Sequence, residues 1–202
     1  MPRFGAVTSP TPRPPGPPGR GRPRSASADA GILAAARALV AELGYAQLTM
    51  EAVAGRAGVA RTTVYRRWPA KADLVVAAVA EPFGALLDQA RHDADPVDVL
   101  AQVADVLERP EIRAAFLSLV SESWRDRSLR LRVEDLLLRP ALEAVRVQVS
   151  AVVGPGTSDD QLQLIDDLVL GALEHRLLVS GRGVDRDYLT RLVDAVRTSL
   201  NA

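Results

Sequence analysis

The sequence predicts an all-α protein, and three observations carry that prediction. Apolar residues recur at helical spacing in nearly every segment after residue 25. No segment alternates apolar and polar residues as a half-buried strand does, and prolines and glycines separate the amphipathic stretches. We therefore expect an N-terminal three-helix domain containing a helix-turn-helix, followed by a larger C-terminal helical domain.

The first expected element is not a helix. Residues 1–25 contain eight of the fourteen prolines, four glycines and five arginines, with no acidic residue. Such a segment buries too little apolar surface to offset the entropy cost of ordering, so we expect a disordered basic tail. Two uses of it stay open, a basic arm that follows nucleic-acid phosphates and an inert tail.

The helices follow from spacing, caps and breakers. Ser25 or Ser27 can cap a first helix that ends at Gly44, and Thr49 can cap a short second helix that closes at Gly58. The other expected helices cover residues 60–66, a stretch from residue 71, and then 84–92, 97–108, 111–126, 129–152 with a bend at Pro140, 159–180 and 186–200. Prolines 82, 96, 110, 140 and 155 punctuate this series.

The net charge of zero is the sum of two unequal halves. Residues 1–81 hold eleven basic and five acidic residues, a net charge of +6, whereas residues 82–202 hold 14 basic and 20 acidic residues, a net charge of −6. Such an asymmetry is typical of contact with nucleic acid or membrane. The longest apolar run, Leu74 to Ala80, is far shorter than the roughly 18 residues of a membrane span, so no membrane partner is expected.

Composition also excludes several kinds of chemistry. The chain has no cysteine, which removes disulfides, thiolate metal sites and a cysteine nucleophile, and is compatible with a cytoplasmic location. His92 and His175 are the only histidines, and neither a dinucleotide-binding glycine motif nor a P-loop is present. We expect no enzyme activity, no cofactor and no metal.

Residues 49–68 carry the strongest motif. A small residue, a turn glycine and a later valine, namely Ala54, Gly58 and Val64, stand at offsets 0, +4 and +10 between two short helices. The small side chain lets the helices cross closely, and glycine permits a left-handed turn. This pattern predicts a helix-turn-helix, whose second helix enters the DNA major groove. We place the domain that contains it at residues 26–82 and the C-terminal domain at 83–202.

The second helix of this motif presents side chains suited to DNA. Arginine, threonine and tyrosine donate hydrogen bonds to phosphates and base edges, and no acidic residue interrupts the run. The alternative is an arginine-rich helix that only faces solvent. The candidate contacts on this helix are Arg61, Thr62, Thr63, Tyr65, Arg66 and Arg67.

Residues 26 to about 75 resemble the N-terminal domain of TetR-type transcriptional regulators. The resemblance rests on Gly44-Tyr45, on Thr49 to Ala54, on Ala57-Gly58-Val59, on Thr63-Val64-Tyr65 and on Lys71 to Leu74. It implies phosphate contacts from Thr49, Thr63, Tyr65 and Lys71. It also implies base contacts from Arg61, Thr62 and Arg66, with Arg67 on the DNA backbone. Ala60 departs from the family, which often has a capping serine there, and Trp68 replaces the usual phenylalanine.

The same resemblance implies a C-terminal domain that binds a small effector and forms a homodimer through its last two helices, residues 159–180 and 186–200. One apolar stripe holds Leu164, Leu168, Gly171, Ala172 and His175, and another holds Leu189, Leu192, Val193, Val196 and Leu200. Both stripes suit a four-helix dimer seam, although packing within one chain is the alternative. Phe116, Trp124 and His175 are candidate pocket residues, with core or interface roles as the alternative.

These observations favour a dimeric, sequence-specific DNA-binding regulator. The expected mechanism is a repressor released from a palindromic operator on double-stranded DNA by a small-molecule effector. A ligand-independent activator or an architectural DNA-binding protein is the alternative. A partly apolar cavity in the C-terminal half would favour the first.

Overall fold

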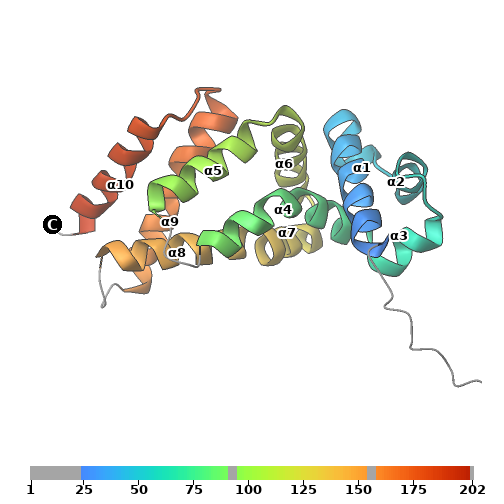
Figure 1. Cartoon of the computed structure of the whole chain (residues 1–202), viewed down its shortest axis with the longest axis horizontal. Coiled ribbons are helices and arrows are strands. Elements are labelled where there is room, and N and C mark those ends of the chain that lie inside the picture. The colour runs from blue at the N-terminus through green and yellow to red at the C-terminus, as the bar shows by residue number, and fades with distance from the viewer. Residues whose placement is uncertain (1–23, 91–94, 154–157, 201–202) are drawn as a thin grey trace, which may run out of the picture.

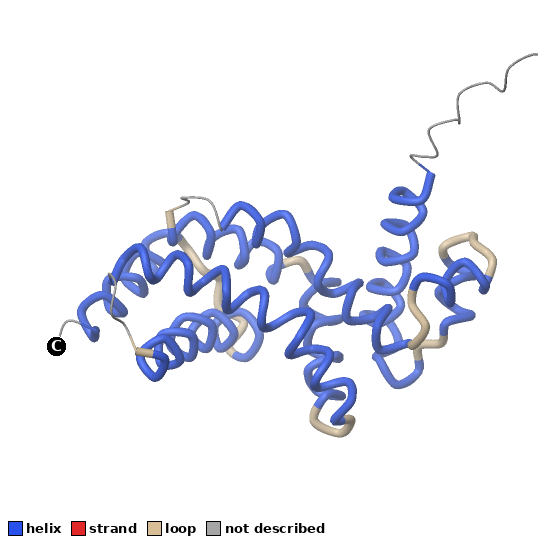
Figure 2. Tube along the Cα trace, turned by 90° about the horizontal axis from the view of Figure 1, so that it is seen from below, coloured by secondary structure: helices blue, strands red, loops and turns tan. Residues whose placement is uncertain are grey.

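The computed structural model describes residues 24–90, 95–153 and 158–200, and every regular element within these ranges is helical (Figure 2). The predicted all-α class is confirmed. The expected disordered tail, residues 1–25, lies outside the described residues except for its last two, which belong to the first helix.

The chain forms an elongated series of helices (Figure 1). α1–α3 lie at one end, α8–α10 lie at the other, and α4 runs from the first group into the second. The helices are α1 (Arg24–Gln47), α2 (Met50–Arg56), α3 (Arg61–Arg67), α4 (Lys71–Ala90), α5 (Pro96–Glu108), α6 (Pro110–Ser123), α7 (Arg127–Val133), α8 (Arg139–Val153), α9 (Asp159–Glu174) and α10 (Arg186–Leu200). Two π-helical segments, η1 (Glu134–Leu138) and η2 (His175–Val179), continue α7 and α9.

The start of α1 differs from the prediction, and the predicted end at Gly44 is a kink within the helix, which continues to Gln47. α1 begins at Arg24, so Ser25 and Ser27 lie in its first turn rather than at its cap. Regular helix geometry is interrupted at Gly44, whose φ of 79° lies in the left-handed region that favours glycine. The backbone N–H of Tyr45 then donates to Ser118 Oγ at 2.9 Å, which ties the end of α1 to α6.

The helix-turn-helix forms as its residues predict. Thr49 Oγ1 accepts a hydrogen bond from the backbone N–H of Ala52 at 3.1 Å and caps α2. Gly58 has a φ of 65° in the turn between α2 and α3. Ala54 and Val64 are buried where the two helices pack, which explains the small residue and the valine at these offsets.

Pro82 does not end a helix, contrary to the prediction. α4 passes through it as one helix, so residues 84–90 of the helix expected at 84–92 form the second half of α4, and residues 91–92 lie outside the described residues. The domain boundary expected at residue 82 falls inside α4. Proline has no N–H and cannot donate to the carbonyl four residues earlier, which belongs to Ala78. Arg37 Nη1 of α1 donates to that carbonyl oxygen at 2.8 Å and contacts Glu81 Oε2 at 3.1 Å. A side chain from another helix thus supplies the missing donor.

The C-terminal helices lie close to their expected bounds. The helix expected at 111–126 ends earlier, at Ser123, because Asp126 caps α7 by accepting from the N–H groups of Ser128 and Leu129. The stretch expected as one helix at 129–152 is divided by the π-helical segment η1, which ends two residues before Pro140. The helices expected at 159–180 and 186–200 are confirmed as α9 with η2 and as α10.

One predicted dimer stripe packs within the chain. Leu189, Val193 and Val196 of α10 are buried in a cluster with residues of α5 and α9. The prediction that the α10 stripe forms a dimer seam is therefore wrong for these three residues, because they complete the core of the C-terminal domain. α10 leaves mainly polar residues exposed.

Candidate functional site

The exposed side of α3 is the candidate nucleic-acid interface. Val64 is fully buried and anchors the opposite side of the helix. Four of the six predicted contact residues on α3 are exposed, and we call them the recognition face: Arg61, Thr62, Tyr65 and Arg66. Within the part of the chain that the structure describes, Arg66 has no ion-pair partner, so its guanidinium is available to a ligand.

An acidic residue that sequence reasoning missed adjoins this face. Glu51 of α2 lies 3.6 Å from Arg61 Nη1, and the Tyr65 hydroxyl donates to Glu51 Oε1 at 3.4 Å. Glu51 precedes the turn, and nothing in the local pattern of α3 predicts that α2 brings a carboxylate to it. Glu51 thus contacts two members of the recognition face, Arg61 and Tyr65.

Two predicted contacts on α3 are less exposed than the recognition face. Arg67 is only 18% exposed in its side chain and forms an ion pair with Asp29 of α1. Its Nη1 also donates to the Thr63 carbonyl at 3.3 Å, and Thr63 itself is half-buried. Arg67 therefore has a partner inside the domain, and its ion pair with Asp29 connects α3 to α1.

Lys71 and Thr49 flank the recognition face and have intramolecular partners. Lys71 Nζ donates to the carbonyls of Tyr45 at 3.0 Å and Ala46 at 3.3 Å, and it lies 4.4 Å from the Tyr45 ring centroid. An ammonium has three donors, so one remains for an anion. Thr49 is exposed, and because its oxygen accepts the cap bond, its hydroxyl proton is free to donate.

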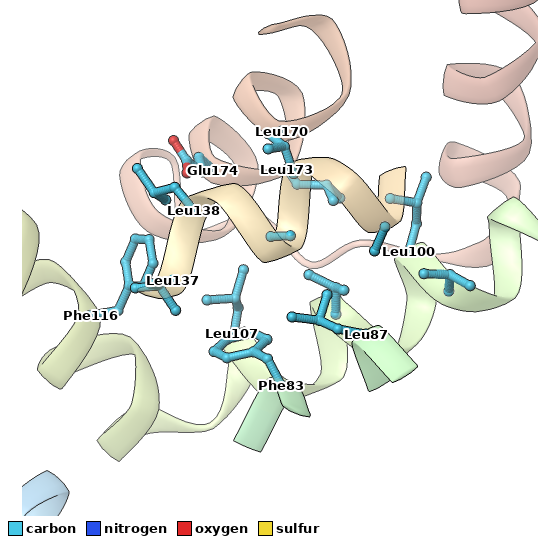
Figure 3. A pocket seen from close by; sticks show the side chains of 14 residues that line it. Phe83, Leu87, Leu100, Leu107, Phe116, Leu137, Leu138, Leu170, Leu173 and Glu174 are labelled. Atoms are coloured by element: carbon cyan, nitrogen blue, oxygen red, sulfur yellow. The ribbon is translucent and has the colours of Figure 1, made fainter. Parts of the chain in front are cut away.

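The C-terminal half contains an apolar cavity of about 70 Å³ (Figure 3). α4 contributes Phe83 and Leu87, and α6 contributes Phe116, one of the three candidate pocket residues. Trp124 and His175 do not line it: Trp124 is 76% exposed at the end of α6, and His175 is exposed at the start of η2. Of these three candidates, only Phe116 lies at the cavity.

Glu174 is the one charged residue among the fourteen that line the cavity. In Figure 3 it lies at one edge, beside Leu138, while Phe83, Leu87 and Leu107 lie across the cavity. Burial raises the pKa of the Glu174 carboxyl above its ordinary value. The sequence offered one weak signal, an acidic residue within the otherwise apolar register of Leu170, Leu173 and Leu177.

α9 presents an exposed apolar stripe. Leu164 is 52% exposed and Leu168 is 41% exposed, and Gly171 and His175 continue the same face one and two turns later. Val179 of η2 extends it and is 75% exposed. A contiguous apolar face of this kind is typical of a helix that packs against a partner.

Other kinds of site are not found in the described ranges. Within residues 24–90, 95–153 and 158–200, no helix is long and apolar enough to cross a membrane. No group of acidic or histidine side chains in these same ranges could hold a metal ion.

An exposed basic helix, carried by a helix-turn-helix and joined to a second helical domain, defines a DNA-binding protein. Comparison with known proteins specifies the family. Residues 32–78 match the family described as bacterial regulatory proteins, tetR family, and residues 86–196 match the tetracyclin repressor-like C-terminal domain. The chain belongs to the TetR family and is a DNA-binding transcriptional regulator. Regulators of this family are not enzymes, in agreement with the prediction.

Relatives of known sequence or structure cover nearly the whole chain. The chain is 30% identical over 182 residues to the DNA-binding transcriptional repressor TetR of Mycobacteroides abscessus, covering 88% of this chain and 93% of that one. The TetR family transcription regulator SCO0332 is 26% identical, with a TM-score of 0.58 over 85% of this chain and 97% of that chain. FadR of Bacillus subtilis, solved in complex with stearoyl-CoA, shares the fold at 20% identity, with a TM-score of 0.61 over 84% of this chain and 96% of that chain.

Proposed function

We propose that the protein is a dimeric repressor that binds a palindromic operator and is released by a small-molecule effector. The observation that carries the proposal is the recognition face, a set of donors on a helix-turn-helix whose other side is buried. In this proposal, residues 26–82 form the domain that binds DNA, and residues 83–202 form the domain that binds the effector and dimerises. The repressor relative from Mycobacteroides abscessus supports the sign of regulation. A protein that acts on bacterial operator DNA works in the cytoplasm.

The exposed residues of α3 supply the base contacts in this proposal. Arg61, Thr62 and Arg66 face the major groove, and Tyr65 and Thr49 donate to phosphates on either side. Lys71 keeps one donor for a phosphate, and half-buried Thr63 contributes at the edge of the surface. Arg67 is left out, because its guanidinium already pairs with Asp29.

The exposed stripe of α9 supplies the dimer contact in this proposal. Two copies of this face, with the small Gly171 allowing close approach, bury Leu164 and Leu168 against each other. A two-fold axis at this seam presents two recognition faces, and two half-sites about one DNA turn apart match them.

α4 connects the cavity to the DNA-binding domain, and this connection is the basis for effector control. Phe83 and Leu87 of α4 line the cavity, and the first turn of the same helix holds Lys71 against the end of α1. The cavity of about 70 Å³ is smaller than the roughly 300–1,000 Å³ of typical ligand pockets. An effector therefore has to part the lining helices, and a displaced α4 changes the spacing of the two recognition faces. A cavity with such a lining favours effector control over the ligand-independent alternative.

The decisive experiment is footprinting on the DNA next to the gene, repeated across a panel of small molecules. We expect protection of a palindrome that a subset of the molecules abolishes. The proposal fails if the purified protein shows no sequence preference at moderate salt, and effector control fails if no compound changes the footprint.

Arg61→Ala is expected to weaken operator binding by about 1–3 kcal/mol and to relax base preference at one position in each half-site. Arg61 is 69% exposed in its side chain, so the loss reflects DNA contact rather than folding. Fluorescence anisotropy on the operator, on single-base variants and on random DNA measures both effects. Arg125→Ala, which removes a 76% exposed arginine of the C-terminal half, is the matched control. Equal losses on operator and random DNA would contradict a base contact.

Glu51→Gln is expected to raise affinity for random DNA about threefold, because it removes an acid next to phosphates and releases Arg61 from its ion pair. Operator binding gains less, since Arg61 loses the charge that positions it, whereas the amide oxygen of glutamine still accepts from Tyr65. The ratio of operator to random affinity, measured at one salt concentration, should therefore fall. Glu42→Gln is the control, because Glu42 pairs with Arg56 instead. An unchanged ratio would show that Glu51 does not position the recognition face.

A further inference from the structure

A groove on the outside of the C-terminal half adjoins the apolar cavity. One face of α4 lines this groove with residues three and four positions apart, namely Ala80, Phe83, Gly84, Leu87 and Asp88. The opposite wall comes from η1 and the start of α8, both of which pack against α4. The groove has a volume of about 220 Å³, whereas the cavity behind it has a volume of about 70 Å³.

Three side chains separate the groove from the cavity, because they line both spaces: Phe83, Leu87 and Leu137 (Figure 3). We call them the partition. Phe83 and Leu137 are buried, whereas Gly84 and Leu136 on the rims of the groove are exposed, Leu136 by 51%. Rotation of the partition side chains joins the two spaces, whose volumes together approach the roughly 300 Å³ at which typical ligand pockets begin.

We propose, building on the effector-controlled function above, that the groove and the cavity form one site for an uncharged ligand with a flexible aliphatic chain. The chain enters between Gly84 and Leu136, passes the partition and ends in the cavity. The polar end of the ligand stays in the groove.

The lining of both spaces selects an uncharged molecule. The cavity wall is almost entirely apolar, and Figure 3 shows the carboxylate of Glu174 pointing away from the enclosed space. Among the described residues, no basic side chain lines either space, so a carboxylate or phosphate would lose hydration without gaining a cationic partner. A cation gains little from Asp88, because this acid at the groove is exposed to water. An aliphatic chain gains from each methylene that it buries.

The walls of the passage favour a slender chain over a rigid ring system. A chain needs the partition side chains to rotate, whereas a rigid ring system needs the helices themselves to separate. Pro82 of α4 and Pro140 of α8 each lack the N–H that would donate to the preceding helical turn. The turn before Pro140 is the π-helical segment η1, and such turns are frequent at functional sites. Both walls therefore have fewer backbone hydrogen bonds beside the partition than regular helices have.

Calorimetric titration of 1-hexanol, 1-octanol and 1-decanol into the full-length protein tests the ligand class. We expect the affinity to rise about fourfold for each added methylene, because each one is buried in an apolar space. Decanoate has the same chain length as 1-decanol and should bind about tenfold more weakly, since its charge finds no partner in the groove.

Gly84→Leu tests the place of the ligand, because it fills the mouth of the groove. A Cβ at Gly84 meets nothing within 4 Å, and leucine is a better helix former than glycine, so the variant should fold. We expect it to lower the affinity for 1-decanol about tenfold. Gly31→Leu is the matched control: Gly31 is also an exposed helical glycine with open space around it, but it lies in α1. Its affinity for 1-decanol should stay within about twofold of wild type.

Leu136→Gln tests the opposite rim, where it replaces an apolar contact of the entering chain by an amide. The affinity for 1-decanol should fall about threefold. Leu131→Gln is the control, because Leu131 of α7 is similarly exposed, at 48%, and does not line the groove.

The outcomes separate this inference from the proposed function. Equal 1-decanol affinity in wild type and Gly84→Leu, affinity that does not rise with chain length, or tighter binding of decanoate would each overturn the inference. Binding that depends on Gly84 but leaves operator binding unchanged would support the site and contradict effector control. Release of the operator by 1-decanol from wild type, but not from Gly84→Leu, would support both. A protein that binds 1-decanol in this way but binds no operator would contradict the proposed function alone.

Discussion

Leu168→Glu is expected to turn the proposed dimer into a monomer and to lower operator affinity by about 10²- to 10⁴-fold, because the two recognition faces then bind independently. Leu168 is 41% exposed in the single chain and lies at the centre of the α9 stripe. Across a dimer seam each copy would place its new carboxylate against the other, in an apolar contact that offers neither a partner. Sedimentation velocity gives the oligomeric state, and titration of a full operator gives the affinity.

The control for this variant matches it in residue type and exposure. Leu117 of α6 is also 41% exposed but lies outside the α9 stripe, so Leu117→Glu should stay dimeric and keep operator affinity. A half-site duplex adds a second check, since Leu168→Glu should bind it about as well as wild type does. A dimeric Leu168→Glu would place the seam elsewhere.

Arg37→Met is expected to lower the free energy of unfolding by about 1–3 kcal/mol, the usual cost of leaving a part-buried acceptor unsatisfied. Arg37 Nη1 donates to the Ala78 carbonyl that Pro82 cannot serve, and methionine keeps the apolar stem while it removes the donor. Urea unfolding followed by circular dichroism, at one fixed protein concentration, measures the loss.

A double-mutant cycle isolates the cause. Pro82→Ala restores a backbone N–H that can donate to the Ala78 carbonyl, so Arg37→Met should cost less in that background. The ion pair between Arg37 and Glu81 is lost in both backgrounds and cancels from the difference. Equal costs in the two backgrounds would mean that the carbonyl does not depend on Arg37.

Local signals predicted most of the fold. Thr49 as a cap and Gly44 and Gly58 at positive φ each act within a few residues along the chain. The exposed residues of α3 could be predicted from the sequence equally well, because burial of Val64 determines which side of a short helix faces outward.

Contacts between distant segments could not be predicted from local signals in the sequence. Pro82 indicated a helix end, yet an arginine 45 residues earlier supplies the donor that lets α4 continue. Arg67 belonged to the basic run of α3, yet Asp29 of α1 binds it. The α10 stripe suited a dimer seam, yet α5 and α9 cover it within the chain. Periodicity shows that a face is buried and does not show against what.

The sequence by itself determined the helical class, the helix-turn-helix, the resemblance to TetR-type regulators and the division of charge between the two halves, because each depends on residues close together in the chain. The tertiary structure alone decided which residues far apart in the chain contact one another. It brought Glu51 to the recognition face, placed Glu174 at the edge of an apolar cavity and left the α9 stripe exposed. These outcomes depend on how helices pack, and the free energy of packing is shared among residues far apart in the chain.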